Sequence, residues 1–185
     1  MRELVFLLEG QSEREMLNGV IPRLLPGVHY RCIAFKGKQD LERQIVWRIR
    51  EYINPQARFI ILRDKDSDDC KIVKQRLLDK CRKTGREVLV RIACHEIESW
   101  YLADLAAVEK GLRISNLARH QNKSKFRKPD STKSPKQELR RLTDDRYQEM
   151  GGSRAIGPHL SLDNKRSCSF AVFMAGVRKM AEIAP

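Results

Sequence analysis

Short apolar runs alternate with amphipathic segments along the first half of the chain. The apolar runs cover residues 4–8, 59–62 and 87–94, and each has the length and composition of a strand in a sheet. Residues 29–35 alternate apolar and polar positions and predict a second strand that is more exposed than the first. The segments between these strands, residues 13–25, 40–53 and 70–83, place apolar side chains at helical spacing. This alternation predicts an α/β fold: a mainly parallel four-stranded sheet with helices on both faces, in three layers.

Breakers and capping residues indicate where the helices begin and end. Ser12 is a cap for the first helix, and Pro26-Gly27 ends it. The second helix is expected to bury one face as far as Ile53 and to end at Asn54-Pro55. A polar loop is expected over residues 63–69.

The pattern changes after Cys94, where helical spacing continues without further strands. It predicts three helices, over residues 97–109, 135–145 and 170–183. Ser134 is a cap for the middle one. A long polar loop is expected over residues 113–135, and Gly151-Gly152 begins another loop.

The charge of the chain is concentrated in its second part. The 185 residues include 37 Lys and Arg against 24 Asp and Glu, which gives a net charge of +13. Residues 110–185 hold 17 basic and 7 acidic residues. We therefore divide the chain into an α/β domain, residues 1–109, and a basic helical and loop extension, residues 110–185, that packs on the domain as one structural unit.

The densest basic tract, residues 119–141, has nine basic and two acidic residues. Such a tract is typical of a surface that binds a polyanion, although a solvated basic loop without a partner has the same composition. Its one aromatic residue, Phe126, favours contacts to a phosphate backbone over base stacking. We predict nucleic-acid contacts for Lys123, Lys125, Arg127, Lys128, Lys133, Lys136, Arg140 and Arg141.

Several classes of protein lack support in the sequence. No apolar run approaches the roughly 20 residues of a membrane helix, and residues 4–8 are too short for the core of a signal peptide. Neither a GxxxxGKS/T loop for ATP hydrolysis nor a GxSxG nucleophile motif occurs. The five cysteines form no CxxC pair, so we expect free thiols, no membrane partner and a cytoplasmic location.

Seven acidic residues lie at or just beyond the ends of three predicted strands: Glu9, Glu13, Asp64, Asp66, Asp68, Glu96 and Glu98. The carboxyl ends of parallel strands share one edge of the sheet, where ligands bind. Converging carboxylates repel one another unless a cation lies between them, and Mg²⁺ or Mn²⁺ suits oxygen ligands. The sequence therefore predicts a metal site at this edge. A solvated turn that caps the next helix is the alternative for residues 64–69.

Two short segments, Glu9-Gly10-Gln11-Ser12-Glu13 and Asp64-Lys65-Asp66, resemble the Toprim pattern of a glutamate after the first strand and an Asp-x-Asp after the third. Toprim domains occur in topoisomerases, bacterial primases and the nucleases of the OLD and recombination-repair families. The resemblance in order and strand placement extends over about residues 1–104. It implies a Toprim-like fold, a role for Glu9 as general acid/base or metal ligand, and Mg²⁺ binding by Asp64 and Asp66.

Three further segments, residues 35–41, 63–70 and 91–104, resemble a bacterial family called domain of unknown function 4276. Its members resemble Toprim proteins and are often encoded beside AAA-type ATPases, in an arrangement similar to phage-defence systems. The resemblance covers most of the chain and implies an AAA-type ATPase as a partner. Glu96 and Glu98 fall outside the general Toprim pattern, so their metal-ligand role is inferred from their position after a strand.

Two hypotheses for function follow from these features. The first is a Mg²⁺-dependent phosphodiesterase, a nuclease of Toprim type acting on DNA or RNA, in which Glu9 transfers a proton and the basic region holds the backbone. The second is a non-catalytic module whose acidic site binds a metal, a nucleotide or the ATPase. A receiver-like phosphoacceptor at Asp64 fits less well, because no acidic pair ends the first strand and no fifth strand ends in lysine. The substrate, the number of metals and the oligomeric state stay open.

Overall fold

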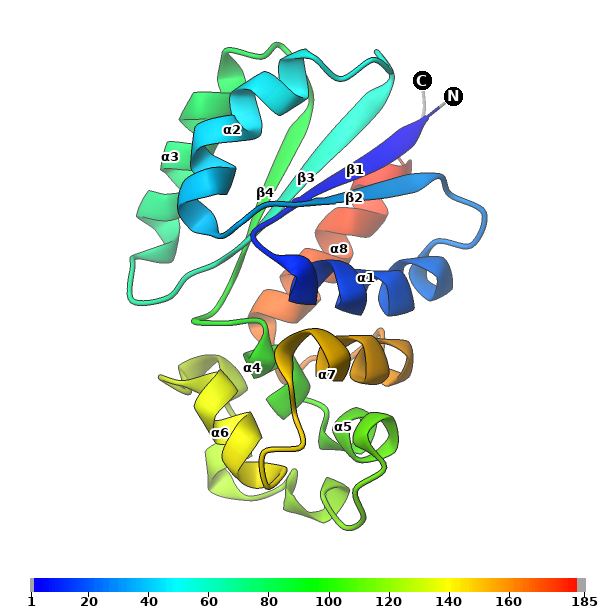
Figure 1. The fold of residues 1–185 in the computed structure, drawn as a ribbon, viewed down its shortest axis with the longest axis vertical. Helices are drawn as coiled ribbons and strands as arrows, with labels where there is room; N and C mark the ends of the chain where they lie inside the picture. Colours follow the sequence, from blue (N-terminus) through cyan, green and yellow to red (C-terminus); the bar gives the residue numbers. More distant parts are fainter. Residues whose placement is uncertain (1, 183–185) are drawn as a thin grey trace.

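The computed structural model of the chain describes residues 2–182, which contain one sheet covered by helices (Figure 1). The sheet has the strand order β2-β1-β3-β4, and every pairing is parallel. Its strands are β1 (Glu3–Leu8), β2 (Tyr30–Ala34), β3 (Ala57–Asp64) and β4 (Val88–Ala93). The prediction of an α/β fold with a mainly parallel four-stranded sheet is therefore confirmed.

Two helices cover each face of the sheet, which makes a three-layer sandwich (Figure 1). One face carries α1 (Gln11–Leu24) and α8 (Cys168–Glu182). The other carries α2 (Lys38–Arg50) and α3 (Cys70–Arg82). The four helices begin and end within two residues of their predicted bounds, except that α2 ends three residues before Ile53. The predicted end of the last helix, Ile183, lies outside the described residues.

Side chains of the central strand alternate between the two cores. Phe6 and Leu8 pack with α1 and α8, whereas Val5 and Leu7 pack with α2 and α3. All four of these side chains are completely buried. Because both faces of the sheet are covered, the inner strands β1 and β3 are mostly apolar and buried, and this is why short apolar runs mark them in the sequence. The edge strand β2 is only partly buried and includes the exposed Arg31.

The connections of β1 and β3 leave the sheet in opposite directions. α1 leads from β1 to β2 over one face of the sheet, and α3 leads from β3 to β4, on the other side of the β1–β3 pair, over the other face. Leu8 is in register with Leu62, so β1 and β3 end side by side. A crevice at such a topological switch point is where open α/β sheets bind ligands.

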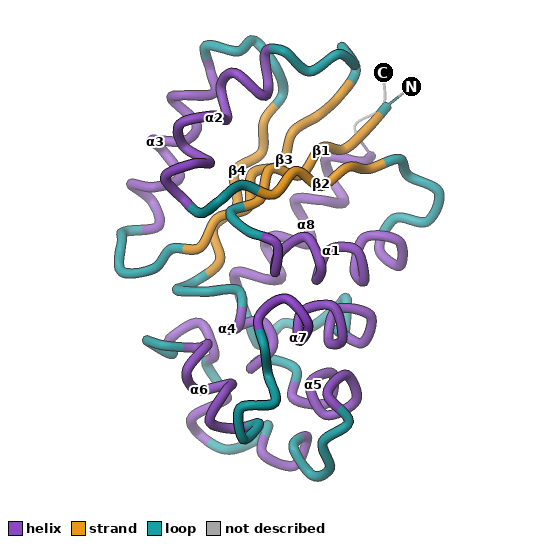
Figure 2. The backbone as a smooth tube through the Cα atoms, viewed as in Figure 1, coloured by secondary structure: helices purple, strands orange, loops and turns teal. Residues whose placement is uncertain are grey.

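The remaining helices form a helical region below the sheet in Figure 2, starting directly after β4. They are α4 (Glu98–Leu102), α5 (Leu105–Leu112), α6 (Pro135–Leu142) and α7 (Glu149–Ile156). The core that contains Phe6 continues into this region through Trp100, Leu105 and Ile156. No helix within residues 2–182 is long and apolar enough to cross a bilayer.

The segment between α5 and α6 was expected to be a long polar loop. It has three 3₁₀ turns, Ala118–His120, Ser124–Phe126 and Pro129–Ser131, and it packs on the helices. The buried amide of Gln121 accepts a hydrogen bond from the Leu105 N–H at 2.7 Å and donates to the Leu102 carbonyl at 3.1 Å. Phe126 is also buried. Such local contacts order the basic tract against α4 and α5.

Four further predictions were wrong in detail. Ile53 is 97% exposed, because α2 ends at Arg50. Arg63 and Asp64 belong to β3, not to a loop. The helix expected over residues 97–109 is divided at Asp104, whose carboxylate caps α5 by accepting the Ala107 N–H at 3.1 Å. The two glycines expected to begin a loop lie inside α7.

Gly152 occurs inside α7 because the Tyr147 ring occupies the space that a side chain would fill. A Cβ on Gly152 would overlap the ring of Tyr147, which is completely buried. A Cβ on the adjacent Gly151 would meet nothing within 4 Å. The pattern of turn residues thus indicated a loop where tertiary packing selects a helical glycine.

This difference predicts opposite effects of two neighbouring substitutions. Gly151→Ala should raise the free energy of unfolding by about 0.5–1 kcal/mol, because alanine has the higher helix propensity and meets no other atom there. Gly152→Ala should lower it by about 1–3 kcal/mol, because the added methyl group displaces the Tyr147 ring. Urea denaturation of the two variants measures both values, and a stabilising Gly152→Ala would contradict the packing described here.

Candidate active site

The first acidic residue of the site, Glu9, follows β1 directly and lies against the end of β3. The Asp64 N–H donates a hydrogen bond to Glu9 Oε2 at 3.3 Å. Gly10 is the N-cap of α1, and a Cβ there would lie 3.2 Å from Glu13 Oε2. Ser12, expected to be the cap, instead donates to Glu13 Oε2 at 3.2 Å. Glu9 and Glu13 therefore flank one tight turn.

Asp64, the last residue of β3, lies among other carboxylates. Burial raises its pKa well above the ordinary value, and the negative charges of Glu13, Glu98, Glu9 and Asp66 raise it further. Its Oδ1 is buried and has no hydrogen-bond partner among residues 2–182. A buried carboxylate oxygen without a partner is costly, so this atom needs a proton or a cation.

Glu98 is the first residue of α4 and lies near Asp64, on which its negative charge acts. Its side chain is buried and accepts a hydrogen bond from the Tyr147 hydroxyl at 2.9 Å. Burial raises the pKa of Glu98 to about 7, although the positive charge of Lys136 opposes the increase. We call Glu9, Glu13, Asp64, Asp66 and Glu98 the acidic edge, because their charges act on one another.

Two of the seven predicted acidic residues lie outside this group. Glu96 accepts the Lys136 N–H at 2.9 Å and so caps α6, for which Ser134 makes no side-chain bond. Asp68 lies on the other side of β3 and pairs with Arg63 at 3.3 Å. Asp68 is therefore a partner of Arg63, and Glu96 caps α6, although its negative charge also adds to the effect of burial in raising the pKa of Glu98.

Asp66 is positioned by a contact between the loops that follow β3 and β4. Its N–H donates to the His95 carbonyl at 2.8 Å, and its own carbonyl lies 3.1 Å from His95 Nδ1. Both residues have positive φ, 54° for Asp66 and 59° for His95. Asp and His adopt this conformation more readily than most residues, and it is common at functional sites. The carboxylate of Asp66 pairs with Lys38 at 2.8 Å.

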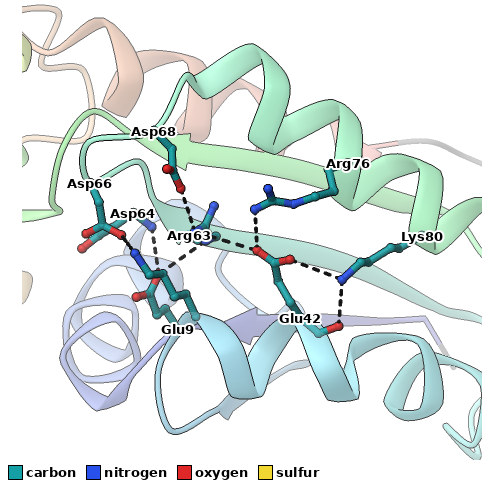
Figure 3. Close-up of polar contacts among 9 residues, drawn as sticks. Glu9, Glu42, Arg63, Asp64, Asp66, Asp68, Arg76 and Lys80 are labelled. Carbon is teal, nitrogen blue, oxygen red and sulfur yellow. Dashed lines mark hydrogen bonds and ion pairs between the residues drawn. The ribbon is translucent and has the colours of Figure 1, made fainter.

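A buried arginine supports the acidic edge from the side of α2 and α3 (Figure 3). Arg63 is 1% exposed, and its guanidinium lies 4.0 Å from Glu9, 3.3 Å from Asp68 and 3.8 Å from Glu42. Glu42 in turn accepts Arg76 at 2.8 Å and Lys80 at 3.3 Å. Sequence reasoning missed Arg63, although the alternation of Phe59 and Ile61 toward α2 and α3 continues to it.

Glu9 has the electrostatic environment of a group that exchanges protons near neutral pH. Burial, followed by the charges of Asp66 and Glu13, raises its pKa to about 7. The Asp64 N–H and the Arg63 guanidinium oppose this increase. A carboxyl group with a pKa near 7 is suited to general acid or base catalysis.

The predicted nucleic-acid contacts are of two kinds. Four of the side chains have acidic partners: Lys125 and Arg141 pair with Glu138, and Lys136 and Arg140 pair with Glu149. The other four, Lys123, Arg127, Lys128 and Lys133, are exposed and have no ion pair in the described part of the chain. The second group is therefore available to a polyanion without exchange of partners.

The donor atoms of the acidic edge fit a hard divalent cation, although they do not form a complete cage. No group of three His, Cys, Asp or Glu side chains within residues 2–182 is arranged to hold a metal by itself. Mg²⁺ is commonly held by one or two carboxylates, water and substrate phosphate, so a complete cage is not needed. The unpartnered Asp64 Oδ1 supplies one such oxygen.

Comparison with known proteins gives one match. The sequence model of a family described as Domain of unknown function (DUF4276) matches residues 8–178. No curated protein and no solved structure matches the chain. The matched range includes all five residues of the acidic edge.

The raised pKa of Glu9 predicts how the stability of the metal-free protein depends on pH. The folded protein holds a proton on Glu9 that the unfolded chain releases, between about pH 4.5 and about 7. The contribution of Glu9 to the free energy of unfolding should therefore fall as pH rises through this window, by at most about 1.4 kcal/mol per pH unit, and then change no further. Urea denaturation in EDTA at a series of pH values measures the slope.

Glu9→Gln should reduce this slope, because glutamine does not titrate. Glu51→Gln, the same change at an exposed position after α2, is the matched control and should leave the slope unchanged. Identical pH profiles for wild type and Glu9→Gln would contradict the assigned environment of Glu9.

Proposed function

The chain belongs to the DUF4276 family, and we propose that it is a phosphodiesterase that hydrolyses nucleic acid with Mg²⁺ or Mn²⁺. One observation carries the proposal: the buried, unpartnered Asp64 Oδ1 lies at the switch point of the sheet, among four other carboxylates. The repulsion between these groups favours binding of a cation, and their oxygen atoms favour a hard one.

Asp64 and Asp66 are the residues that hold the cation in this proposal, with Glu9 beside them. Binding requires Asp66 to exchange its half-exposed ion pair with Lys38 for the cation. The bound ion supplies stabilisation of negative charge on the phosphate. Glu13 and Glu98 contribute further negative charge from α1 and α4.

Glu9 is the group that transfers a proton. Its pKa of about 7 allows both protonation states near neutral pH. Arg63, which contacts Glu9 at 4.0 Å and is itself held by Glu42 and Asp68, limits the orientations of the carboxylate. Release from Asp66 leaves the Lys38 ammonium group available to a substrate phosphate.

The basic tract supplies a surface for the rest of the substrate. Its exposed and unpaired cations, Lys123, Arg127, Lys128 and Lys133, are suited to phosphate contacts that do not depend on base sequence. The Toprim resemblance of the segments at Glu9 and Asp64 supports the same function. We further propose an AAA-type ATPase as partner, a role similar to that of phage-defence effectors, and a cytoplasmic location, which the five free cysteines support.

A second candidate is a non-catalytic module that binds a metal, a nucleotide or the ATPase. The observation in its favour is that two lysines already offset part of the negative charge of the acidic edge: Lys38 pairs with Asp66, and Lys136 lies near Glu98. In addition, residues 2–182 contain no group of three side chains arranged to hold a metal. Tight binding of metal or nucleotide without turnover distinguishes this candidate.

Hydrolysis of plasmid and single-stranded DNA and RNA, with Mg²⁺ or Mn²⁺, tests the proposed activity. Asp64→Asn/Asp66→Asn should abolish cleavage, because it removes the two proposed ligand carboxylates. Glu9→Gln should lower the rate by about 100-fold or more, because the proton transfer is lost. Thermal unfolding of each variant shows whether it is folded.

The matched control is Asp145→Asn/Asp163→Asn, which changes two exposed aspartates outside the acidic edge by the same charge. It should cleave like the wild type. Equal cleavage by the wild type and Asp64→Asn/Asp66→Asn would overturn the proposal, and so would a wild type that cleaves none of the substrates with either metal.

A further inference from the structure

We propose that the groove between α2 and α3 binds the phosphate backbone of a nucleic-acid strand and guides it to the acidic edge. This inference rests on the proposed function for the identity of the strand. It concerns a surface different from the basic tract, which lies on the opposite part of the molecule around α6 (Figure 1). We call this surface the α2–α3 groove.

Two adjoining hollows make up the α2–α3 groove. The larger has a volume of about 860 Å³ and extends between the helices to Arg50 and Lys83. The smaller has a volume of about 440 Å³ and lies over the start of α2 and the end of β3. Glu42, Arg76 and Lys80 line both hollows, so the two are parts of one groove.

Basic side chains outnumber acidic ones along the whole groove. In the larger hollow, Arg50, Arg76, Lys80 and Lys83 are opposed by Glu42 and Asp79. In the smaller hollow, five basic side chains are opposed by two acidic ones, Glu42 and Asp68. The surplus of positive charge is complementary to a polyanion.

The central carboxylate of the groove is already shared. Burial would raise the pKa of Glu42, but hydrogen bonds from Arg76 and Lys80 outweigh that effect and lower it. Arg63 approaches the same carboxylate at 3.8 Å, and its Nε and Nη1 have no hydrogen-bond partner among residues 2–182. Arg63 is also paired with Asp68, but Arg76 and Lys80 have only Glu42 as ion-pair partner in the described chain, so positive charge that attracts an anion remains.

The arrangement of the cations fits a strand better than a single small anion. Lys38 is the first residue of α2 and Arg50 the last, so cations line a length of about 18 Å along the helix. At about 3.4 Å per nucleotide, that length corresponds to about five phosphates of a helically stacked strand. Arg50 also donates to the Lys83 carbonyl at 3.0 Å, which connects the two helices at the far end.

The inner end of the groove touches the acidic edge. Lys38 pairs with Asp66 at 2.8 Å, and Arg63 contacts Glu9 at 4.0 Å. Figure 3 shows Glu9, Arg63 and Glu42 in one continuous row of polar contacts. A backbone seated along α2 and α3 therefore leads directly to the proposed catalytic carboxylates.

Fluorescence anisotropy with labelled single-stranded DNA and RNA of one sequence, in EDTA, measures binding without hydrolysis. Arg50→Gln/Lys83→Gln removes two exposed cations that pair with no carboxylate in the described chain. It should weaken binding at low salt by at least about tenfold and reduce the salt dependence by about 1.4 in log–log slope, as expected for two lost phosphate contacts.

Arg48→Gln/Lys179→Gln is the matched control, because it removes the same charge from exposed positions outside the groove. It should bind within about twofold of the wild type. Equal losses in both double variants, equal affinity of the wild type and the groove variant, or no binding of either probe by the wild type would overturn the inference. Asp64→Asn/Asp66→Asn should still bind the labelled strands. Weaker binding by Arg50→Gln/Lys83→Gln, with normal binding by the other variants, therefore supports the groove even if the wild type does not cleave nucleic acid.

Discussion

The parallel pairing of β1 with β3 is the constraint on which the whole site depends. Because Leu8 and Leu62 are in register, Glu9 and Asp64 end at the same edge, and the Asp64 N–H donates to the Glu9 carboxylate. The same pairing forces like charges together. Burial first, and this repulsion second, raise the pKa values of Glu9 and Asp64, and the proposed cation would relieve the repulsion.

Arg63 links the acidic edge to the α2–α3 groove. It is the one buried charge at the end of β3 that faces α2 and α3, and it contacts Glu9, Glu42 and Asp68 together. A cation in this position limits the repulsion on Glu9 and connects the acidic edge to the cations of α2 and α3 that line the groove. The protein thus places negative charge at the strand ends and positive charge along the adjacent helices, an arrangement suited to a phosphate chain and a divalent cation.

The four parallel strands, the positions of the helices that cover them and the edge that carries the acidic residues were predictable from local patterns, whereas the strand order was not. Apolar runs such as residues 4–8 mark strands covered on both faces, and Glu9 and Asp64 follow such strands directly. Prediction failed where a distant contact decides the local structure. Gly152 is helical because the buried Tyr147 ring occupies the space of a side chain, and Glu96 caps α6 across 40 residues of sequence.

The sequence by itself determined the class of fold and the chemical character of the edge, because period and residue type are local properties. Only the tertiary structure decided which carboxylates converge: Glu13 and Glu98 join Glu9, Asp64 and Asp66, whereas Asp68 turns to Arg63 and Glu96 to α6. It also decided that cations of α2 and α3 line one groove. The physical reason is that burial and charge–charge interaction depend on distance in space, and residues far apart in the chain meet only after the sheet and its covering helices have packed.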